Sequence, residues 1–247
     1  MRTLVKRVSL LMCLVILCGI VCSCELISAD PDALITEAEA ALDNAPYSVD
    51  MRVIYDSDDE DMKEAILSFS EPTVKMNVNK DDFSAKMEFT HDGYKSYISY
   101  AYIDKELYVK VDDNGRVTQN KISLDSFDKD EIAGAIGVDT TLGVSDFDTV
   151  KAEGIGSVKV ITCTDIKLDS LTKITSSLAE KLQSIDAIVS VKDVVLAIQV
   201  KDGKYDTTIL TCTYKIVTAE NEYELDMTFA TKFRYGSDVE VVPPFED

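Results

Sequence analysis

Apolar and polar residues alternate along most of this chain beyond residue 46, a period typical of strands with one buried face. The segment from Tyr223 to Tyr235 shows it most clearly, with aromatic and aliphatic side chains between charged ones. Similar segments begin at Tyr47, Val74, Phe83, Leu107, Val194 and Leu210, and an extended stretch with a break at Gly154-Ile155-Gly156 covers 144–167. The pattern predicts a long antiparallel meander.

Three segments instead repeat their apolar residues every three or four positions, as a helix with one buried side does. The first begins at Asp30-Pro31, a capping residue followed by proline, and ends before Pro46. A shorter helix is expected within 123–137. The third is an amphipathic helix whose apolar stripe is Leu168, Leu171, Ile174, Leu178, Leu182 and Ile185.

Strands and helices together predict a single α+β domain. The sheet has roughly ten strands, and open sheets of that size tend to curl. We therefore expect a strongly curved antiparallel sheet, an incomplete barrel, with the helices packed on its concave face.

The N-terminus has the pattern of an export signal. Arg2, Lys6 and Arg7 precede an apolar run from Val8 to Val21, which is short for a membrane span. Val21-Cys22-Ser23-Cys24 closes that run. It resembles the lipobox of bacterial lipoproteins, in which the cysteine after a small residue is lipidated.

This resemblance implies a domain plan and a location. Residues 1–23 form a lipoprotein signal peptide, 24–29 a tether, 30–240 one domain and 241–247 an irregular tail. Lipid on Cys24 would anchor the chain to the outer face of the cell membrane. Ordinary cleavage and an uncleaved signal anchor are the alternatives.

The charge of the chain narrows the choice of partners. The formal net charge is −20, and loss of residues 1–23, which hold three basic and no acidic residues, makes it −23. Such a domain repels nucleic-acid phosphates, so no nucleic-acid partner is expected. Protein partners are not indicated by the sequence.

Two cysteines remain in the domain, Cys163 and Cys212, each between threonines in an expected strand. Export permits a disulfide between them. Two buried free thiols are the equally ordinary alternative.

No arrangement of residues indicates catalysis. His91 is the only histidine, and no zinc spacing, phosphate-binding loop or dinucleotide motif occurs. The acidic run at 56–61 lacks the glycine and spacing of a calcium loop, and a solvated turn is favoured. We expect no cofactor, no metal and no enzymatic activity.

One set of apolar residues suggests a ligand. Methionines adapt to irregular apolar shapes, and several occupy the apolar face of expected strands among aromatic residues. The candidate lining of an acyl-chain site is Met51, Met76, Phe83, Met87, Phe89, Leu225, Met227 and Phe229. An ordinary hydrophobic core is the alternative.

A lipobox, an N-terminal helix, a long meander and interrupting amphipathic helices together resemble the LolA-like lipoproteins, which include the periplasmic carrier LolA and the mycobacterial LppX/LprG group. The resemblance covers Asp30 to Glu240 and carries no residue motif. It implies a curved sheet plugged by helices, with lipid between them. The expected function is therefore a membrane-anchored lipoprotein that binds a hydrophobic ligand, and the alternative is a cell-envelope interaction or structural module.

Overall fold

The computed structural model describes residues 27–59, 72–91, 93–124, 142–171, 188–219 and 221–245. These residues form one sheet of twelve strands in the order β1-β8-β9-β10-β11-β12-β2-β3-β4-β5-β6-β7. All neighbouring strands that pair are antiparallel. The predicted antiparallel meander is confirmed, with more strands than the ten expected.

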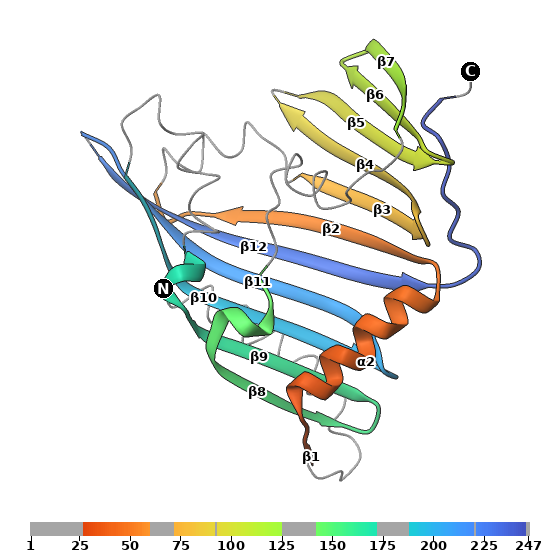
Figure 1. The fold of residues 1–247 in the computed structure, drawn as a ribbon. Helices are drawn as coiled ribbons and strands as arrows, with labels where there is room; N and C mark the ends of the chain where they lie inside the picture. The colour runs from red at the N-terminus through yellow and green to blue at the C-terminus, as the bar shows by residue number, and fades with distance from the viewer. Residues whose placement is uncertain are drawn as a thin grey trace.

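The sheet consists of two meanders (Figure 1). The first contains β2 (Tyr47–Asp56), β3 (Thr73–Asn79), β4 (Asp82–His91), β5 (Tyr94–Ile103), β6 (Glu106–Asp113) and β7 (Arg116–Ser123). The second contains β8 (Phe147–Ile155), β9 (Val158–Ile166), β10 (Ile188–Lys201), β11 (Lys204–Val217) and β12 (Glu222–Tyr235), preceded by the 3-10 turn η1 (Val144–Asp146).

Two of the tight turns have the chemistry that a short hairpin requires. Asn114 and Gly115 have φ of 50° and 85°, and Asp202 and Gly203 have φ of 52° and 70°. Asparagine, aspartate and glycine tolerate this left-handed backbone, which matches the twist of the flanking strands. These local turns fix the register of β6 with β7 and of β10 with β11.

The two meanders are joined by the pairing of β12 with β2, strands from opposite ends of the chain. Ten residue pairs along this junction run from Asp226 with Asp56 to Tyr235 with Tyr47. At the outer edges lie β7 and the two-residue strand β1 (Ile27–Ser28), so the sheet is not closed.

Strand β1 corrects one boundary of the predicted domain plan. Ile27 and Ser28 pair with Gly154 and Glu153 on β8, and the Ala29 amide donates to the Ala152 carbonyl at 3.0 Å. Residues 27–29, which were expected to belong to the tether at 24–29, are therefore held at the edge of the sheet. Alternation over only two residues is too short to identify such a strand from sequence.

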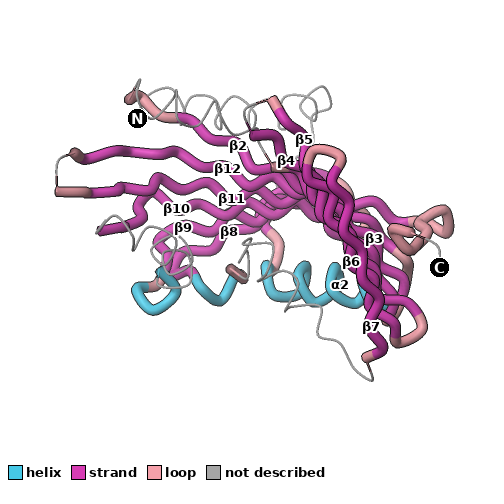
Figure 2. The backbone as a smooth tube through the Cα atoms, turned by 90° about the horizontal axis from the view of Figure 1, so that it is seen from above, coloured by secondary structure: helices cyan, strands magenta, loops and turns pink. Residues whose placement is uncertain are grey.

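Helix α2 (Pro31–Asn44) begins and ends where the sequence predicts. The Asp32 amide donates to the Asp30 carboxylate at 3.1 Å, which caps the first turn. Ala38, fully buried, faces the sheet, and α2 packs chiefly against β11 and β8. Figure 2 shows α2 along one side of the sheet, with β3 to β7 turned out of the plane of β8 to β11.

The apolar side chains form two clusters on the side of the sheet that α2 covers. The larger one joins α2 to β8–β12 and includes Ala38, Ile161, Leu196 and Leu210. The smaller one is centred on Val78, Phe83 and Tyr102 of β3, β4 and β5. The core thus follows the sheet from one half to the other, and α2 packs over the half formed by β8–β12.

Only the start of the predicted amphipathic helix is described. The helix begins at Leu168, whose side chain is 79 % exposed, whereas Leu171 packs against the larger cluster. Leu168 is therefore wrong as the first buried residue of the stripe, because it lies in the opening turn and faces solvent. The rest of this helix, and the helix expected within 123–137 beyond Leu124, lie outside the described residues.

Candidate functional site

The eight residues predicted to line an apolar surface share one face of the sheet. They lie on four consecutive strands, β12, β2, β3 and β4. Direct pairs place them in one pattern: Phe229 lies opposite Val53, Met51 opposite Val74, and Val74 opposite Met87. Because side chains two apart on a strand share a face, the register brings Met51, Met76, Phe83, Met87, Phe89, Leu225, Met227 and Phe229 to this face.

Burial divides the eight into two kinds. Phe83 and Leu225 are 2 % and 8 % exposed and belong to the packed core. The other six are half-buried, and they include all four of the methionines. We call the six half-buried residues Met51, Met76, Met87, Phe89, Met227 and Phe229 the apolar patch. Flexible side chains with some surface left uncovered are the ones that could adapt to an apolar ligand.

Cys163 and Cys212 are both buried and free. Strand β10 lies between their strands β9 and β11, and Leu196 of β10 stands opposite Cys163. Strands lie about 4.8 Å apart, so β9 and β11 are about 10 Å apart, beyond the roughly 7 Å that a disulfide spans between Cα atoms. Of the two alternatives, the structure has the free thiols.

Burial also makes these thiols unreactive. It raises the pKa of Cys163 to about 11 and that of Cys212 to about 12. The thiolate is the nucleophile and the metal ligand, and burial keeps it from forming near neutral pH. Neither cysteine has the environment of a catalytic residue.

Several predicted features fall on residues of which little is described. Cys24, the signal peptide and the side chain of His91 lie outside the described residues, as do the last residues of the acidic run. Within the described ranges, no three His, Cys, Asp or Glu residues come together as metal ligands would. Nor does any helix there have the length and apolar character to cross a membrane.

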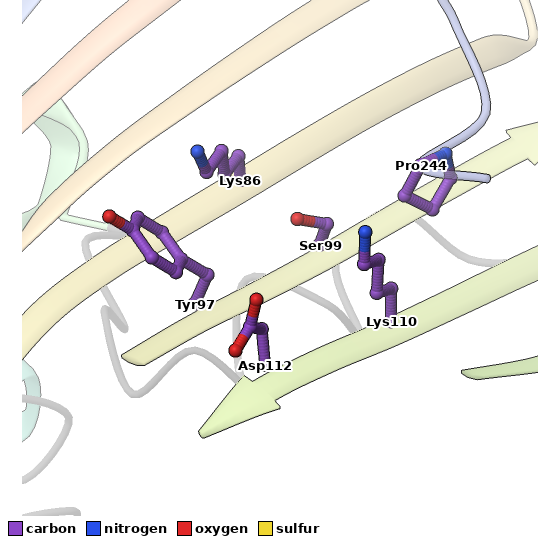
Figure 3. A pocket seen from close by; sticks show the side chains of 6 residues that line it. All are labelled: Lys86, Tyr97, Ser99, Lys110, Asp112 and Pro244. Carbon is purple, nitrogen blue, oxygen red and sulfur yellow. The ribbon is translucent and has the colours of Figure 1, made fainter. Parts of the chain in front are cut away.

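A second candidate site lies on the opposite face of the sheet. It is a hollow of about 340 Å³ lined by Lys86 of β4, Tyr97 and Ser99 of β5, Lys110 and Asp112 of β6, and Pro244. Figure 3 shows these side chains around the hollow, with Pro244 carried by the C-terminal tail. The Lys86 ammonium lies 4.2 Å from the centre of the Tyr97 ring.

The tail is held across this outward face at two points. The Asn77 amide group donates to the Glu240 carbonyl at 2.9 Å. Phe245 meets the Tyr108 ring edge-on, with centroids 5.5 Å apart. These contacts explain how Pro244 becomes one wall of the hollow. The tail was predicted to be irregular, and as far as Phe245, where the described residues end, it forms neither helix nor strand but packs on the sheet.

This hollow was not predicted from the sequence. Lys86, Ser99 and Lys110 read as ordinary solvent-side residues between apolar ones, and only the register across β4, β5 and β6 sets them in a row. The contribution of Pro244 depends on the path of the tail. Alternation reveals which face a residue occupies but not its neighbour on the next strand.

Comparison with known proteins leaves the chain unassigned. No family model matches it, and no curated protein matches it. Among solved structures it is similar to the ywiB protein from Bacillus subtilis, with a TM-score of 0.19 and 9% identity over 78% of this chain and 93% of that one. A variant of the GphF dehydratase gives a TM-score of 0.14 and 7% identity, over 84% and 85%. Likeness this weak carries no argument about fold or function.

Proposed function

We propose that this protein is a membrane-anchored extracytoplasmic lipoprotein that binds a hydrophobic ligand, a lipid or an acyl chain, on the apolar side of its sheet. The proposal takes the sheet as an incomplete barrel with its helices on the concave face. The observation that carries it is the apolar patch: six half-buried residues on four adjacent strands.

Among the described residues, the position of helix α2 supports this location. Helix α2 packs on β8 and β11, where the larger cluster lies. Met51, Met76, Met87 and Phe89 lie further along, on β2 to β4. Full burial of an exposed methionine or phenylalanine side chain is worth about 1.5–3 kcal/mol. These side chains are already half-buried, so a ligand that covers several of them gains part of that free energy from each.

A paired substitution tests the ligand. Met87→Gln changes a half-buried residue of the apolar patch, whereas Ile54→Gln changes an apolar residue on the opposite face that is 41% exposed. We expect the full chain in detergent to take up a fluorescent fatty acid, Met87→Gln to weaken uptake about tenfold, and Ile54→Gln to leave it unchanged. Uptake that is absent from the unmodified chain, or reduced equally by both substitutions, would rule the ligand out.

Material from the native host gives the complementary measurement. Native mass spectrometry of the protein extracted from membranes should show an added lipid mass beyond the covalent anchor. A stoichiometric protein in place of lipid would favour the cell-envelope interaction module instead.

The anchor has its own test, which depends on the lipobox alone. Cys24→Ala should release the protein from membranes or leave it with its full signal peptide, because the lipidated thiol is gone. Ser23→Gly keeps a small residue before the cysteine and should leave the anchor in place. A Cys24→Ala chain that fractionates and migrates like the unmodified one would contradict the lipoprotein proposal.

A further inference from the structure

Three lysines follow one another across the outward face of the sheet. Lys75 stands opposite Lys86, Lys86 opposite Ser99, and Ser99 opposite Lys110. Like charges directly opposite one another destabilise a strand pair. Acidic residues are abundant in this chain, whose net charge is −20, yet none lies between these lysines in the row. The row therefore concentrates positive charge on a protein that is otherwise strongly negative.

The acids beside this row are engaged by other groups. Glu88 pairs with Lys95 at 3.1 Å, and Asp50 pairs with Arg234 at 2.8 Å. Asp112 accepts the Gly115 amide at 2.9 Å. Within the described part of the chain, none of the three lysines forms an ion pair of its own.

Two of these lysines line the hollow on the outward face. Lys86 and Lys110 approach it from β4 and β6, and the Ser99 hydroxyl lies on β5 between them. The Tyr97 ring holds the Lys86 ammonium on one side, and Pro244 closes another. We propose that this hollow binds a small phosphate-bearing anion, with Lys86, Lys110 and Ser99 donating to its oxygens.

A phosphate fits these donors better than a carboxylate does. Its tetrahedral oxygens can meet two ammonium groups and a hydroxyl that approach from three strands, whereas a carboxylate offers two oxygens in one plane. The volume of about 340 Å³ exceeds that of a free phosphate ion, so the small organic part of a monoester also has room.

Asp112 restricts the ligand to a small one. It follows Lys110 by two residues on β6 and lines the same hollow, about 7 Å further along the strand. A polyanion that extended past the lysine row would meet this carboxylate and the net negative charge of the whole chain. The site therefore selects a single phosphate group and is separate from the apolar patch, which lies on the opposite face.

The test titrates the full chain, in a phosphate-free detergent, against inorganic phosphate while the phosphorus NMR line width is followed. Lys86→Gln and Lys110→Gln should each weaken binding about tenfold, since each removes a charged donor. Lys151→Gln is the matched control, because it makes the same charge change at an exposed residue on β8. Lys86→Arg keeps the charge and should retain binding.

The outcomes separate the possibilities. Glycerol phosphate that binds more tightly than inorganic phosphate identifies a monoester as the ligand, and equal binding identifies the free anion. Absence of line broadening with the unmodified chain at about ten millimolar phosphate would overturn the proposal, since affinity weaker than this has little use in a cell. Equal losses in Lys86→Gln and Lys151→Gln, or displacement by equimolar chloride, would also overturn it.

Discussion

Val53 on β2 lies directly opposite Phe229 on β12, and this pair joins the two halves of the sheet. Val53 is 3 % exposed, so its two methyl groups are packed at the junction. The pair belongs to the only part of the described sheet that unites opposite ends of the chain. Its packing is therefore expected to contribute to the stability of both meanders.

Val53→Ala tests this junction. Loss of two buried methyl groups with the cavity they leave should lower the free energy of unfolding by about 1–3 kcal/mol. Val117→Ala on the edge strand β7 makes the same change at a residue that is 50 % exposed, and should cost less than about 0.5 kcal/mol. Urea denaturation of both variants gives the comparison, and equal losses would contradict the assigned junction.

The free cysteines make a direct chemical prediction. Cys163 and Cys212 are buried side chains of strands β9 and β11, and strand β10 lies between them. Neither should react with a thiol reagent in the native protein, and both should react once it is denatured without reductant. Reducing and non-reducing gels should show the same mobility. If the denatured protein shows two fewer reactive thiols without reductant than with it, the two cysteines form a disulfide after all.

Much of the fold follows from local sequence pattern, and the features that were not predicted share one physical cause. Helix α2 depends on residues close in sequence, so their identities sufficed to predict it. The β12–β2 pairing and the β1 contact with β8 join distant segments, and alternation does not specify which strands meet. The shared face of the apolar patch was predictable, because every second residue of a strand points to the same side of the sheet. The hollow was not predictable, because it depends on the register between strands and on the path of the tail.

Alkaline pH should destabilise the protein through groups that burial keeps protonated. Burial raises the pKa of Tyr205 to about 12 and that of Tyr235 to about 12. The unfolded chain releases its tyrosine protons near pH 10, earlier than the folded one does. Stability contributed by these groups is therefore present below about pH 10 and is lost as the pH rises towards 12.

Denaturation midpoints measured at about pH 8 and about pH 10.5 should differ, with the lower midpoint at the higher pH. Tyr205→Phe should reduce that difference, because it removes one of the titrating hydroxyls. Tyr94→Phe alters a tyrosine that is 58 % exposed and should leave the difference unchanged. A denaturation midpoint that rises between about pH 8 and about pH 10.5 would contradict the predicted loss of stability at alkaline pH.

Gly154 on β8 is required by close contact rather than by backbone conformation. A Cβ atom there would clash with the Val158 carbonyl and lie 2.7 Å from the Lys159 Cα. Gly154→Ala should therefore destabilise the β8–β9 hairpin by about 1–3 kcal/mol through overpacking. Gly143→Ala is the control, since the nearest atom to its Cβ is 3.8 Å away. Thermal melting of the two variants distinguishes steric crowding from a general effect of losing glycine.

Asp146 organises the segment that leads into β8 and the helix that starts at Leu168. Its carboxylate accepts the Ser170 hydroxyl at 2.6 Å and the Gly143 amide at 2.8 Å, and its carbonyl accepts the Lys167 amide at 2.8 Å. Asp146 and Ser170 are only 7 % and 6 % exposed. The helix start is thus tied to η1 by a buried polar contact that no sequence pattern indicated.

Asp146→Ala leaves the buried Ser170 hydroxyl without this acceptor, and an unsatisfied buried polar group costs about 1–3 kcal/mol. The Gly143 amide also loses its acceptor, but Gly143 is exposed and water can replace it. The variant should lose about 1–3 kcal/mol of unfolding free energy, whereas Asp148→Ala, at an exposed neighbour, should lose less than about 0.5 kcal/mol. A double-mutant cycle with Ser170→Ala isolates the pair, because the two losses should not add if the carboxylate and hydroxyl interact. Strict additivity would mean that the contact between the carboxylate and the hydroxyl contributes nothing to stability.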